Sequence, residues 1–378
     1  MSYTVAIIGT GPNPDNPSSD GFAMAYRHAA GYERLDQCQL TACVDIVPEN
    51  ARQFADHWNI RSEFVFEKTE AMLDMVQPEI VSVCVPPHVH ADVVLACASH
   101  GAPEAIHCEK PMAKTWAECR EMVGACQQAG VQLTFNHQRR FGQPFRAAKQ
   151  LLDAGKIGTL QRIEIGGQNL YDYGSHMFDL AGYITDQESV EWVLAGIDYS
   201  EENVQFGAHN ENRAIAQWHY ENGVTGLAAT GEQSSVQCQL RLLGDEGIIE
   251  IDEGDTPLRL CNDSGWQSVD TGHDGIHGPQ PSLVSAALQA VAERAPFMSG
   301  RQIGSASYID RAIEEVVTAL DEGRESELSA TNALQATELI FACWESARRQ
   351  GRVDLPLDIS DNPLESMVEN GDLLVSTK

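Results

Sequence analysis

The chain has 378 residues, of which 43% are hydrophobic and 21% charged, as is typical of a folded protein with a core. Its 55 acidic residues against 25 basic ones give a net charge of -30, which disfavours binding to nucleic acid or anionic lipid. No window approaches 18 consecutive apolar residues, and the N-terminal sequence MSYTVAIIGTG lacks the basic start of a secretory signal. We therefore expect a cytoplasmic protein with no membrane or nucleic-acid partner, and its length suggests two domains.

The first predicted elements form a β-α-β unit typical of dinucleotide binding. The run YTVAIIGTG is a buried-strand pattern that ends in Gly9, Thr10 and Gly11, and a helical stretch over residues 21–32 leads to the strand LTACVD. Gly9 permits a tight turn, Gly11 lets backbone amides approach a pyrophosphate, and the helix N-terminus favours the negative charge of that group. Asp45 ends the second strand, where a carboxylate accepts hydrogen bonds from the adenosine ribose and repels a 2'-phosphate. This predicts NAD, with NADP less favoured.

One departure from the usual glycine fingerprint is the segment PNPDNPSSD, residues 12–20, between Gly11 and Gly21. Three prolines among Asn, Asp and Ser residues are incompatible with a first helical turn. We interpret the segment as an insertion in the phosphate loop, with Gly21 in the place of the third glycine. The alternative, that these glycines form only a structural turn, is disfavoured by the strand, helix and acid around them.

Strands and helices continue to alternate up to residue 135, which predicts a parallel sheet with right-handed crossovers. The loops at the carboxyl ends of such strands line the ligand crevice. The segment PPHVH, with Pro87 and His90, and the segment CEKP, with Glu109 and Lys110, follow two of these strands. We therefore expect all four residues on the cofactor side of the sheet, with Lys110 beside the nicotinamide ring.

The segment after Lys110 predicts a sharp change of direction and a new helix. Pro111 prevents the strand from continuing, and Thr115 and Glu118 have the spacing of a capping box for a helix that runs to Gly130. The ten cysteines contain no C-x-x-C pair, and several stand in apolar runs, which is typical of buried reduced thiols. His88 and His90 have no third ligand near in sequence, so we expect no metal site.

A second group of polar residues lies in QNLYDYGSHMFDLAGYI. Asp172 and His176 are four residues apart at a predicted helix start, so they are expected to share a face. Such a pair is suited to a general base with an orienting carboxylate. Spacing alone leaves open a structural alternative, in which the acid stabilises the helix dipole and the histidine is buried on a backbone partner.

Together with NHQRRF (residues 136–141), these motifs resemble the Gfo/Idh/MocA family, the relatives of glucose–fructose oxidoreductase and inositol dehydrogenase, over roughly residues 3–358. The resemblance implies an α/β fold in two parts. Residues 1–135 would form an N-terminal Rossmann domain with a doubly wound parallel sheet. Residues 136–378 would form an α/β domain for substrate binding and oligomerisation, with a large, mainly antiparallel sheet open on one face. A homodimer or homotetramer through that face is expected, and the residues after Leu357 match nothing in the family.

The resemblance also implies roles for the polar residues. Lys110 and His176 would work on a substrate hydroxyl beside nicotinamide C4, with Asp172 next to them. The polar surroundings of the second motif favour a carbohydrate, and substrate contacts are expected from Gln138, Asn169 and Tyr173.

Three functions are compatible with these motifs. The leading hypothesis is a dehydrogenase that transfers a hydride between NAD and a hydroxyl of a sugar, cyclitol or sugar derivative. A second is a glycosidase or lyase that works through transient oxidation with retained NAD. A third is a non-enzymatic dinucleotide-binding sensor, which the presence of both Lys110 and His176 disfavours.

Overall fold

The computed structural model describes residues 2–12, 24–253, 257–272 and 306–373. They fall into two compact units, which are described separately. The first unit comprises Met1–Glu109, Met122–Gln138 and His273–Ala330, and the second comprises Lys110–Glu121, Arg139–Gly272 and Thr331–Lys378. The chain enters each of the two units three times.

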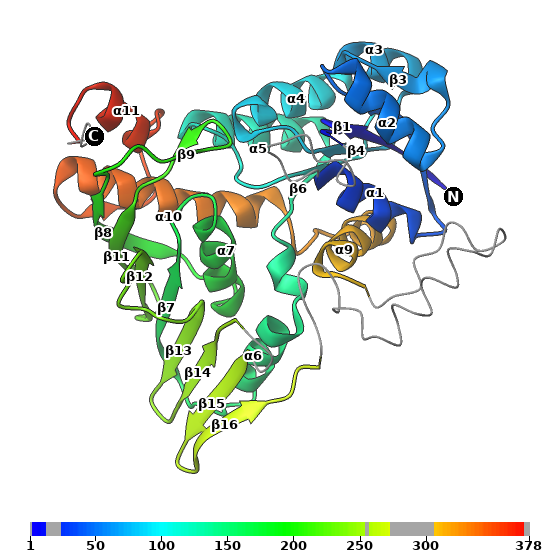
Figure 1. The fold of residues 1–378 in the computed structure, drawn as a ribbon. Helices are drawn as coiled ribbons and strands as arrows, with labels where there is room; N and C mark the ends of the chain where they lie inside the picture. Colours follow the sequence, from blue (N-terminus) through cyan, green and yellow to red (C-terminus); the bar gives the residue numbers. More distant parts are fainter. Residues whose placement is uncertain (1, 13–23, 254–256, 273–305, 374–378) are drawn as a thin grey trace. The chain divides into compact units, whose positions relative to one another are not determined.

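The first unit contains a six-stranded parallel sheet in the order β3-β2-β1-β4-β5-β6, drawn in blue to teal in Figure 1. The chain adds strands outward from β1 to one edge of the sheet and then from β4 to the other edge, as in a doubly wound nucleotide-binding sheet. This order confirms the predicted Rossmann fold. The strands are β1 (Tyr3–Ile8), β2 (Cys38–Val44), β3 (Val65–Phe66), β4 (Ile80–Val83), β5 (Ala105–Cys108) and β6 (Gln132–Phe135). The helices between them are α1 (Met24–Glu33), α2 (Pro48–Trp58), α3 (Thr69–Val76), α4 (Pro87–His100) and α5 (Trp116–Ala129).

Helix α9 (Tyr308–Glu322) belongs to the first unit, although it follows the strands of the second unit in sequence. Its residues Ile309, Ile313 and Val317 recur every four positions and are buried in one core with α1. A Cβ atom on Gly31 of α1 would lie only 2.9 Å from Cγ1 of Ile313, so the missing side chain allows the two helices to approach closely. Figure 1 shows α9 directly beside α1. The core of the first unit therefore depends on a distant segment.

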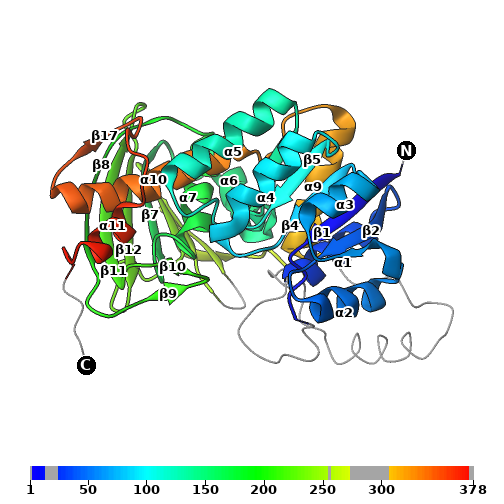
Figure 2. The ribbon, with the colours of Figure 1, turned by 90° about the horizontal axis from the view of Figure 1, so that it is seen from above.

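The second unit is built on a nine-stranded sheet in the order β16-β15-β14-β13-β7-β12-β11-β8-β17. Only β7 and β12 pair in parallel, so the sheet is mainly antiparallel, as predicted. Figure 2 shows β8, β11, β12 and β7 side by side. The strands are β7 (Leu160–Gly167), β8 (Val190–Asp198), β11 (Arg213–Tyr220), β12 (Thr225–Gly231), β13 (Leu240–Gly244), β14 (Ile248–Ile251), β15 (Leu258–Asn262), β16 (Gly265–Val269) and β17 (Val353–Asp354).

Among the residues that the structure describes, the second unit also contains a small hairpin and four α-helices. The hairpin strands β9 (Val204–Gln205) and β10 (Ala208–His209) form a separate two-stranded sheet. The helices are α6 (Gln143–Asp153), α7 (Gly174–Ile184), α10 (Ala330–Arg349) and α11 (Pro363–Glu369). Within the described ranges, none of the helices has the length and apolar character needed to span a bilayer.

The two faces of the large sheet differ because side chains alternate along each strand. On one face Trp218 of β11 packs on Phe178 of α7, with ring centroids 5.3 Å apart. A Cβ atom on Gly226 of the neighbouring strand would lie 1.8 Å from the indole, so this glycine makes room for Trp218. On the opposite face Leu194 and Ile215 are 46% and 65% exposed. The sheet therefore has one covered and one open face.

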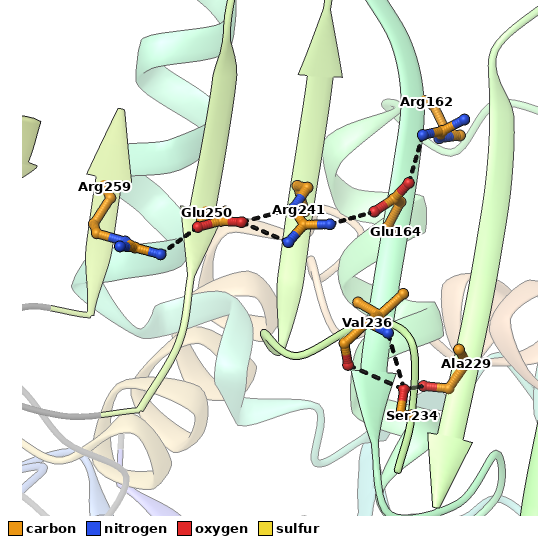
Figure 3. A network of polar contacts seen from close by, with 8 residues as sticks. All are labelled: Arg162, Glu164, Ala229, Ser234, Val236, Arg241, Glu250 and Arg259. Atoms are coloured by element: carbon orange, nitrogen blue, oxygen red, sulfur yellow. Dashed lines mark hydrogen bonds and ion pairs between the residues drawn. The ribbon is translucent and has the colours of Figure 1, made fainter. Parts of the chain in front are cut away.

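A row of alternating charges crosses four strands on the open face, as Figure 3 shows. Glu164 accepts ion pairs from Arg162 and Arg241, both at 2.7 Å. Glu250 pairs with Arg241 at 2.6 Å and with Arg259 at 2.5 Å. Both carboxylates are nearly buried, at 6% and 7% side-chain exposure. Each buried acid thus has two cationic partners, which compensates the cost of removing it from water.

Candidate active site

The turn after β1 admits only glycine at its first position. Gly9 has φ +84°, and a Cβ atom on it would lie 2.6 Å from Cγ1 of Val85 and 2.9 Å from the backbone nitrogen of Val85. Gly11 also has a positive φ, 62°, and Thr10 between them is fully buried. The turn therefore has the backbone geometry that we expected of a phosphate loop. Gly21 and residues 13–20 of the insertion lie outside the described residues.

Asp45 at the end of β2 holds the glycine turn. Its Oδ2 accepts hydrogen bonds from the backbone nitrogen of Gly11 at 2.8 Å and from Oγ1 of Thr10 at 3.0 Å, and its Oδ1 accepts one from the nitrogen of Val47 at 2.8 Å. A carboxylate has about four lone-pair positions, so Oδ1 retains capacity to accept a ribose hydroxyl. Ile46, the next residue, is 86% exposed and offers an apolar surface. The residues present fit the adenosine half of NAD.

Pro87 and His90 lie at the start of α4, behind the glycine turn. Pro87 is the first residue of the helix and is buried. Nε2 of His90 donates to the carbonyl oxygen of Val85 at 2.8 Å, and the imidazole is fully buried. The backbone that faces Gly9 is therefore held by His90, and this contact gives His90 a structural role beside the predicted cofactor loop.

Glu109 at the end of β5 is the centre of a buried polar network. Its Oε1 accepts hydrogen bonds from Nε2 of His28 at 2.8 Å and from Nδ2 of Asn136 at 2.7 Å. Burial opposes a charge on His28, but its interactions with Cys84 and Glu109 outweigh burial and raise its pKa to about 10. These two hydrogen bonds join α1, through His28, and the residue after β6, Asn136, to the end of β5. Lys110 is the next residue after Glu109.

Lys110 and Asp172 form an ion pair within the second unit, although 62 positions separate them. Nζ of Lys110 donates to Oδ1 of Asp172 at 2.8 Å and to its carbonyl oxygen at 3.1 Å. The two side chains are 18% and 20% exposed, so the pair is shielded from bulk water but accessible. The peptide bond between Lys110 and Pro111 is cis. Two of the three predicted catalytic residues are thus in direct contact.

His176 lies in the first turn of α7 and is 6% exposed. Its backbone nitrogen donates to the carbonyl oxygen of Tyr173 at 3.2 Å. Helix α7 begins at Gly174, so Asp172 lies in the turn that leads into the helix. Asp172 and His176 thus lie on either side of the first residue of α7.

Three hydrogen bonds fix the turn that carries Asp172. The backbone nitrogen of Asp172 donates to Oδ1 of Asn210 at 3.2 Å, and that of Tyr173 donates to Oδ1 of Asn169 at 2.9 Å. The nitrogen of Leu170 donates to Oε1 of Glu211 at 2.6 Å. Asn169, predicted to contact substrate, therefore uses its amide oxygen to shape the turn.

Glu211 is a completely buried carboxyl group. Besides Leu170, it accepts a hydrogen bond from Nε1 of Trp344 at 3.0 Å. Burial raises the pKa of Glu211 to about 7, against the opposing effect of its hydrogen bonds. The sequence analysis missed this residue and its neighbour Asn210. They stand in HNENR, between two strands, where nothing in the local pattern marks a link to Asp172.

Two consecutive arginines next to this turn have different partners. Arg140 forms a two-point ion pair with Asp179, with both contacts at 2.7 Å and both side chains 2% exposed. Arg139 donates from Nη1 to Oε1 of Gln239 at 2.8 Å and to the hydroxyl of Tyr173 at 3.4 Å, and its guanidinium lies 4.7 Å from the Tyr173 ring centre. Tyr173, predicted to contact substrate, is thus held by a buried cation.

Gln138, the third predicted substrate contact, begins the short 3-10 helix Gln138–Phe141 and is 7% exposed. The predicted capping box of Thr115 and Glu118 is confirmed: the nitrogen of Thr115 donates to Oε2 of Glu118 at 2.9 Å, and the nitrogen of Glu118 donates to Oγ1 of Thr115 at 3.3 Å. This box fixes the start of α5, five residues after Lys110.

The C-terminal tail packs on the segment that follows Lys110. Nδ2 of Asn362 donates to the carbonyl oxygen of Lys114 at 2.8 Å, and Nζ of Lys114 pairs with Oε2 of Glu365 at 2.8 Å. Nε1 of Trp116 donates to the carbonyl oxygen of Leu357 at 3.2 Å. Residues for which the sequence suggested no role therefore support the chain next to the candidate catalytic lysine.

Two models of known protein families match the chain. The model of the oxidoreductase family with NAD-binding Rossmann fold (GFO_IDH_MocA) matches residues 4–137. The model of the C-terminal alpha/beta domain of the same family matches residues 149–355. Together the two matches span both units.

Curated relatives are similar over most of the chain. An inositol 2-dehydrogenase of Pseudomonas fluorescens is 25% identical, with 96% of this chain and 99% of the relative covered. A D-apiose dehydrogenase of Paraburkholderia graminis is 23% identical, with 91% and 90% covered. A 2,7-anhydro-N-acetylneuraminate hydratase of Mediterraneibacter gnavus is 33% identical, with 61% of this chain and 63% of the relative covered.

Solved structures share the fold. A levoglucosan dehydrogenase in complex with NADH and levoglucosan has a TM-score of 0.71 at 20% identity, with 94% of this chain and all of the other covered. An aldose-aldose oxidoreductase of Caulobacter crescentus has the same TM-score at 21% identity, with the same coverage.

Proposed function

The chain belongs to the Gfo/Idh/MocA oxidoreductase family, with its NAD-binding Rossmann fold and C-terminal α/β domain, and on this premise we propose that it is a dehydrogenase of a sugar, cyclitol or sugar derivative. The observation that carries the proposal is the 2.8 Å ion pair between Lys110 and Asp172, which joins the two sequence motifs that the family resemblance singles out. The names of the relatives, an inositol dehydrogenase and an apiose dehydrogenase, support polyhydroxylated substrates.

In the proposed reaction His176 accepts the proton of a substrate hydroxyl. The hydrogen on the same carbon leaves with its electron pair to NAD, which supplies the hydride acceptor when bound. Lys110 stabilises the negative charge that develops on the substrate oxygen, an effect worth about 3 kcal/mol in a site shielded from water. Asp172 orients the ammonium group, with which it already shares two hydrogen-bond contacts.

We also propose NAD in preference to NADP. Asp45 supports this, because its free acceptor position suits a ribose hydroxyl and its negative charge disfavours a 2'-phosphate. Thr10 and Gly11, held by the same carboxylate, would stand beside the pyrophosphate.

The decisive experiment is an assay of NAD reduction at 340 nm against a panel of sugars, inositols and glycosides. Turnover with at least one polyol that depends on added NAD is the expected result. Absence of NADH formation with every member, together with cleavage of a glycoside by protein that retains NAD after purification, would favour the redox-neutral alternative. The relative named a hydratase is the observation that keeps this second candidate in the test.

We further propose that the open face of the large sheet joins two copies of the chain. Leu194, Ile215 and Trp266 lie on this face and are 46%, 65% and 49% exposed, and the charges of the arginine–glutamate row are already paired within one chain. Covering such a surface has a low desolvation cost, because its exposed side chains are apolar and its charges are already paired. Sedimentation analysis of Ile215→Asp tests the idea, with a shift from dimer or tetramer to monomer expected and an unchanged mass contradicting it.

We also propose a cytoplasmic location for the protein.

A further inference from the structure

Arg139 is a buried cation with no acidic hydrogen-bond partner among the residues that the structure describes. It is 8% exposed, and its two hydrogen bonds go to neutral groups, the side chains of Gln239 and Tyr173. Its Nε is buried and has no hydrogen-bond partner among the residues that the structure describes. A guanidinium has five N–H donors, so much of its capacity is unused.

The neighbouring Arg140 shows how this chain ordinarily compensates such a charge. Both side chains of the Arg140–Asp179 pair are 2% exposed, and the carboxylate binds the guanidinium at two points. An uncompensated buried charge is strongly destabilising. The ring of Tyr173, 4.7 Å from the guanidinium centre, offsets only part of that cost. The chain has 55 acidic residues, yet among those described none forms an ion pair with Arg139.

The position of Arg139 connects it to the candidate catalytic turn. Tyr173 follows Asp172 directly, and a Cβ atom on Gly167 would lie 2.3 Å from the Tyr173 ring, so the ring is closely confined. Among the described residues, the hydrogen bonds of Arg139 lead to an acid only indirectly: Gln239, which accepts from Arg139, donates from Nε2 to Oε1 of Glu253 at 3.4 Å. A guanidinium without a direct carboxylate partner among the described residues is suited to binding an anionic group.

From these observations we propose that Arg139 binds an anionic group of the substrate, a carboxylate or a phosphoryl group, so that the enzyme acts on an acidic sugar derivative. The inference rests on the proposed dehydrogenase function and narrows its substrate class. The guanidinium forms a charge-assisted hydrogen bond to the anion through its unused donors, while the reacting hydroxyl is held by Lys110 and His176. Binding of the anion supplies the charge partner that Arg139 lacks within the described part of the chain.

The test uses the NADH-bound enzyme, in which oxidation cannot proceed, and calorimetric titration with matched ligands. The pairs are D-glucuronate against D-glucose and D-galacturonate against D-galactose, with D-glucose 6-phosphate as the phosphoryl arm. Binding of one acid roughly 10- to 100-fold tighter than its neutral match is expected. Preference for the phosphate ester over the carboxylates would assign the anion as phosphoryl. Equal binding of acidic and neutral members, or no binding of any acid, would overturn the inference.

Variants tie the preference to this residue. Arg139→Gln should abolish the preference for the acid, so that acidic and neutral ligands have similar dissociation constants. Arg139→Lys should retain part of the preference, because it keeps the charge but loses the planar guanidinium. Arg61→Gln is the matched control, because Arg61 also stacks on an aromatic ring, 4.5 Å from that of Phe64, but is exposed. An acid preference that survives in Arg139→Gln would overturn the assignment. Selective acid binding without NAD reduction by any ligand would refute the dehydrogenase function alone.

Discussion

Replacement of Glu211 by glutamine removes the one buried carboxyl that ties the turn of Asp172 to helix α10. In the wild type this group accepts hydrogen bonds from Leu170 and Trp344 and is fully buried. The amide of Glu211→Gln keeps an oxygen for Leu170 but presents a nitrogen where Trp344 needs an acceptor. The variant therefore loses one hydrogen bond, which costs about 1 kcal/mol at every pH. Because an amide does not titrate, position 211 no longer contributes to the pH dependence of stability.

The pH dependence gives the stronger signal. Burial raises the pKa of Glu211 from its ordinary value of 4.5 to about 7 in the folded chain. Because the folded pKa is the higher one, its contribution to stability is fully present below pH 4.5 and is lost as pH rises through 7. The full loss is about 3 kcal/mol, and most of it falls between pH 5 and pH 8. The free energy of unfolding of the wild type should thus fall by that amount relative to Glu211→Gln.

Urea unfolding at pH 5, 6, 7 and 8, followed by tryptophan fluorescence, measures this difference. Five of the six tryptophans lie in the second unit, so the signal reports mainly on the part that contains Glu211. Titration of the other groups is common to both proteins and cancels in the difference. Glu121→Gln is the control, since Glu121 is exposed and solvated in both states. Parallel curves for wild type and Glu211→Gln, or a difference of opposite sign, would refute the reasoning.

Three further changes have distinct expected results. Lys110→Ala should lower kcat by about 10²- to 10³-fold while NAD, titrated by fluorescence quenching, still binds; Lys110→Arg should restore little, and near-normal turnover of the alanine variant would remove Lys110 from the chemistry. Asp45→Ser should raise the ratio of NAD to NADP dissociation constants, and an unchanged ratio would show that Asp45 does not read the ribose. Asn362→Ala should lower stability by about 1–2 kcal/mol, seen as a lower melting temperature, because its side chain caps α11 and holds Lys114. An unchanged melting temperature would show that the tail contributes little.

Much of the fold was predictable because its signals are local. A β-branched run followed by Gly9 and Gly11 specifies a strand and a turn with positive φ, and both glycines have that geometry. Thr115 and Glu118 satisfy each other across one helical turn, so four residues of sequence suffice to identify the start of α5. Alternation of strands and helices then fixes the parallel sheet of the first unit.

The candidate site was predictable only in part. Family motifs identified Lys110 and Asp172, and the structure joins them. The motifs did not reveal Glu211, which reaches Leu170 across 41 positions, because a single acid in a loop has no periodicity or spacing to detect. Nor did they distinguish Arg139 from Arg140, since identical residues side by side differ only in what packs against them.

The sequence by itself thus determined the order of elements, the glycine turn and the motif residues, since each depends on neighbours within a few positions. Tertiary structure alone decided that α9 completes the first core through Ile313 and Gly31, and that Asn362 supports the segment after Lys110. It also decided which buried charges are compensated. The physical reason is that burial, and the pairing of a buried polar group, depend on every segment that packs around it, and those segments come from distant parts of the chain.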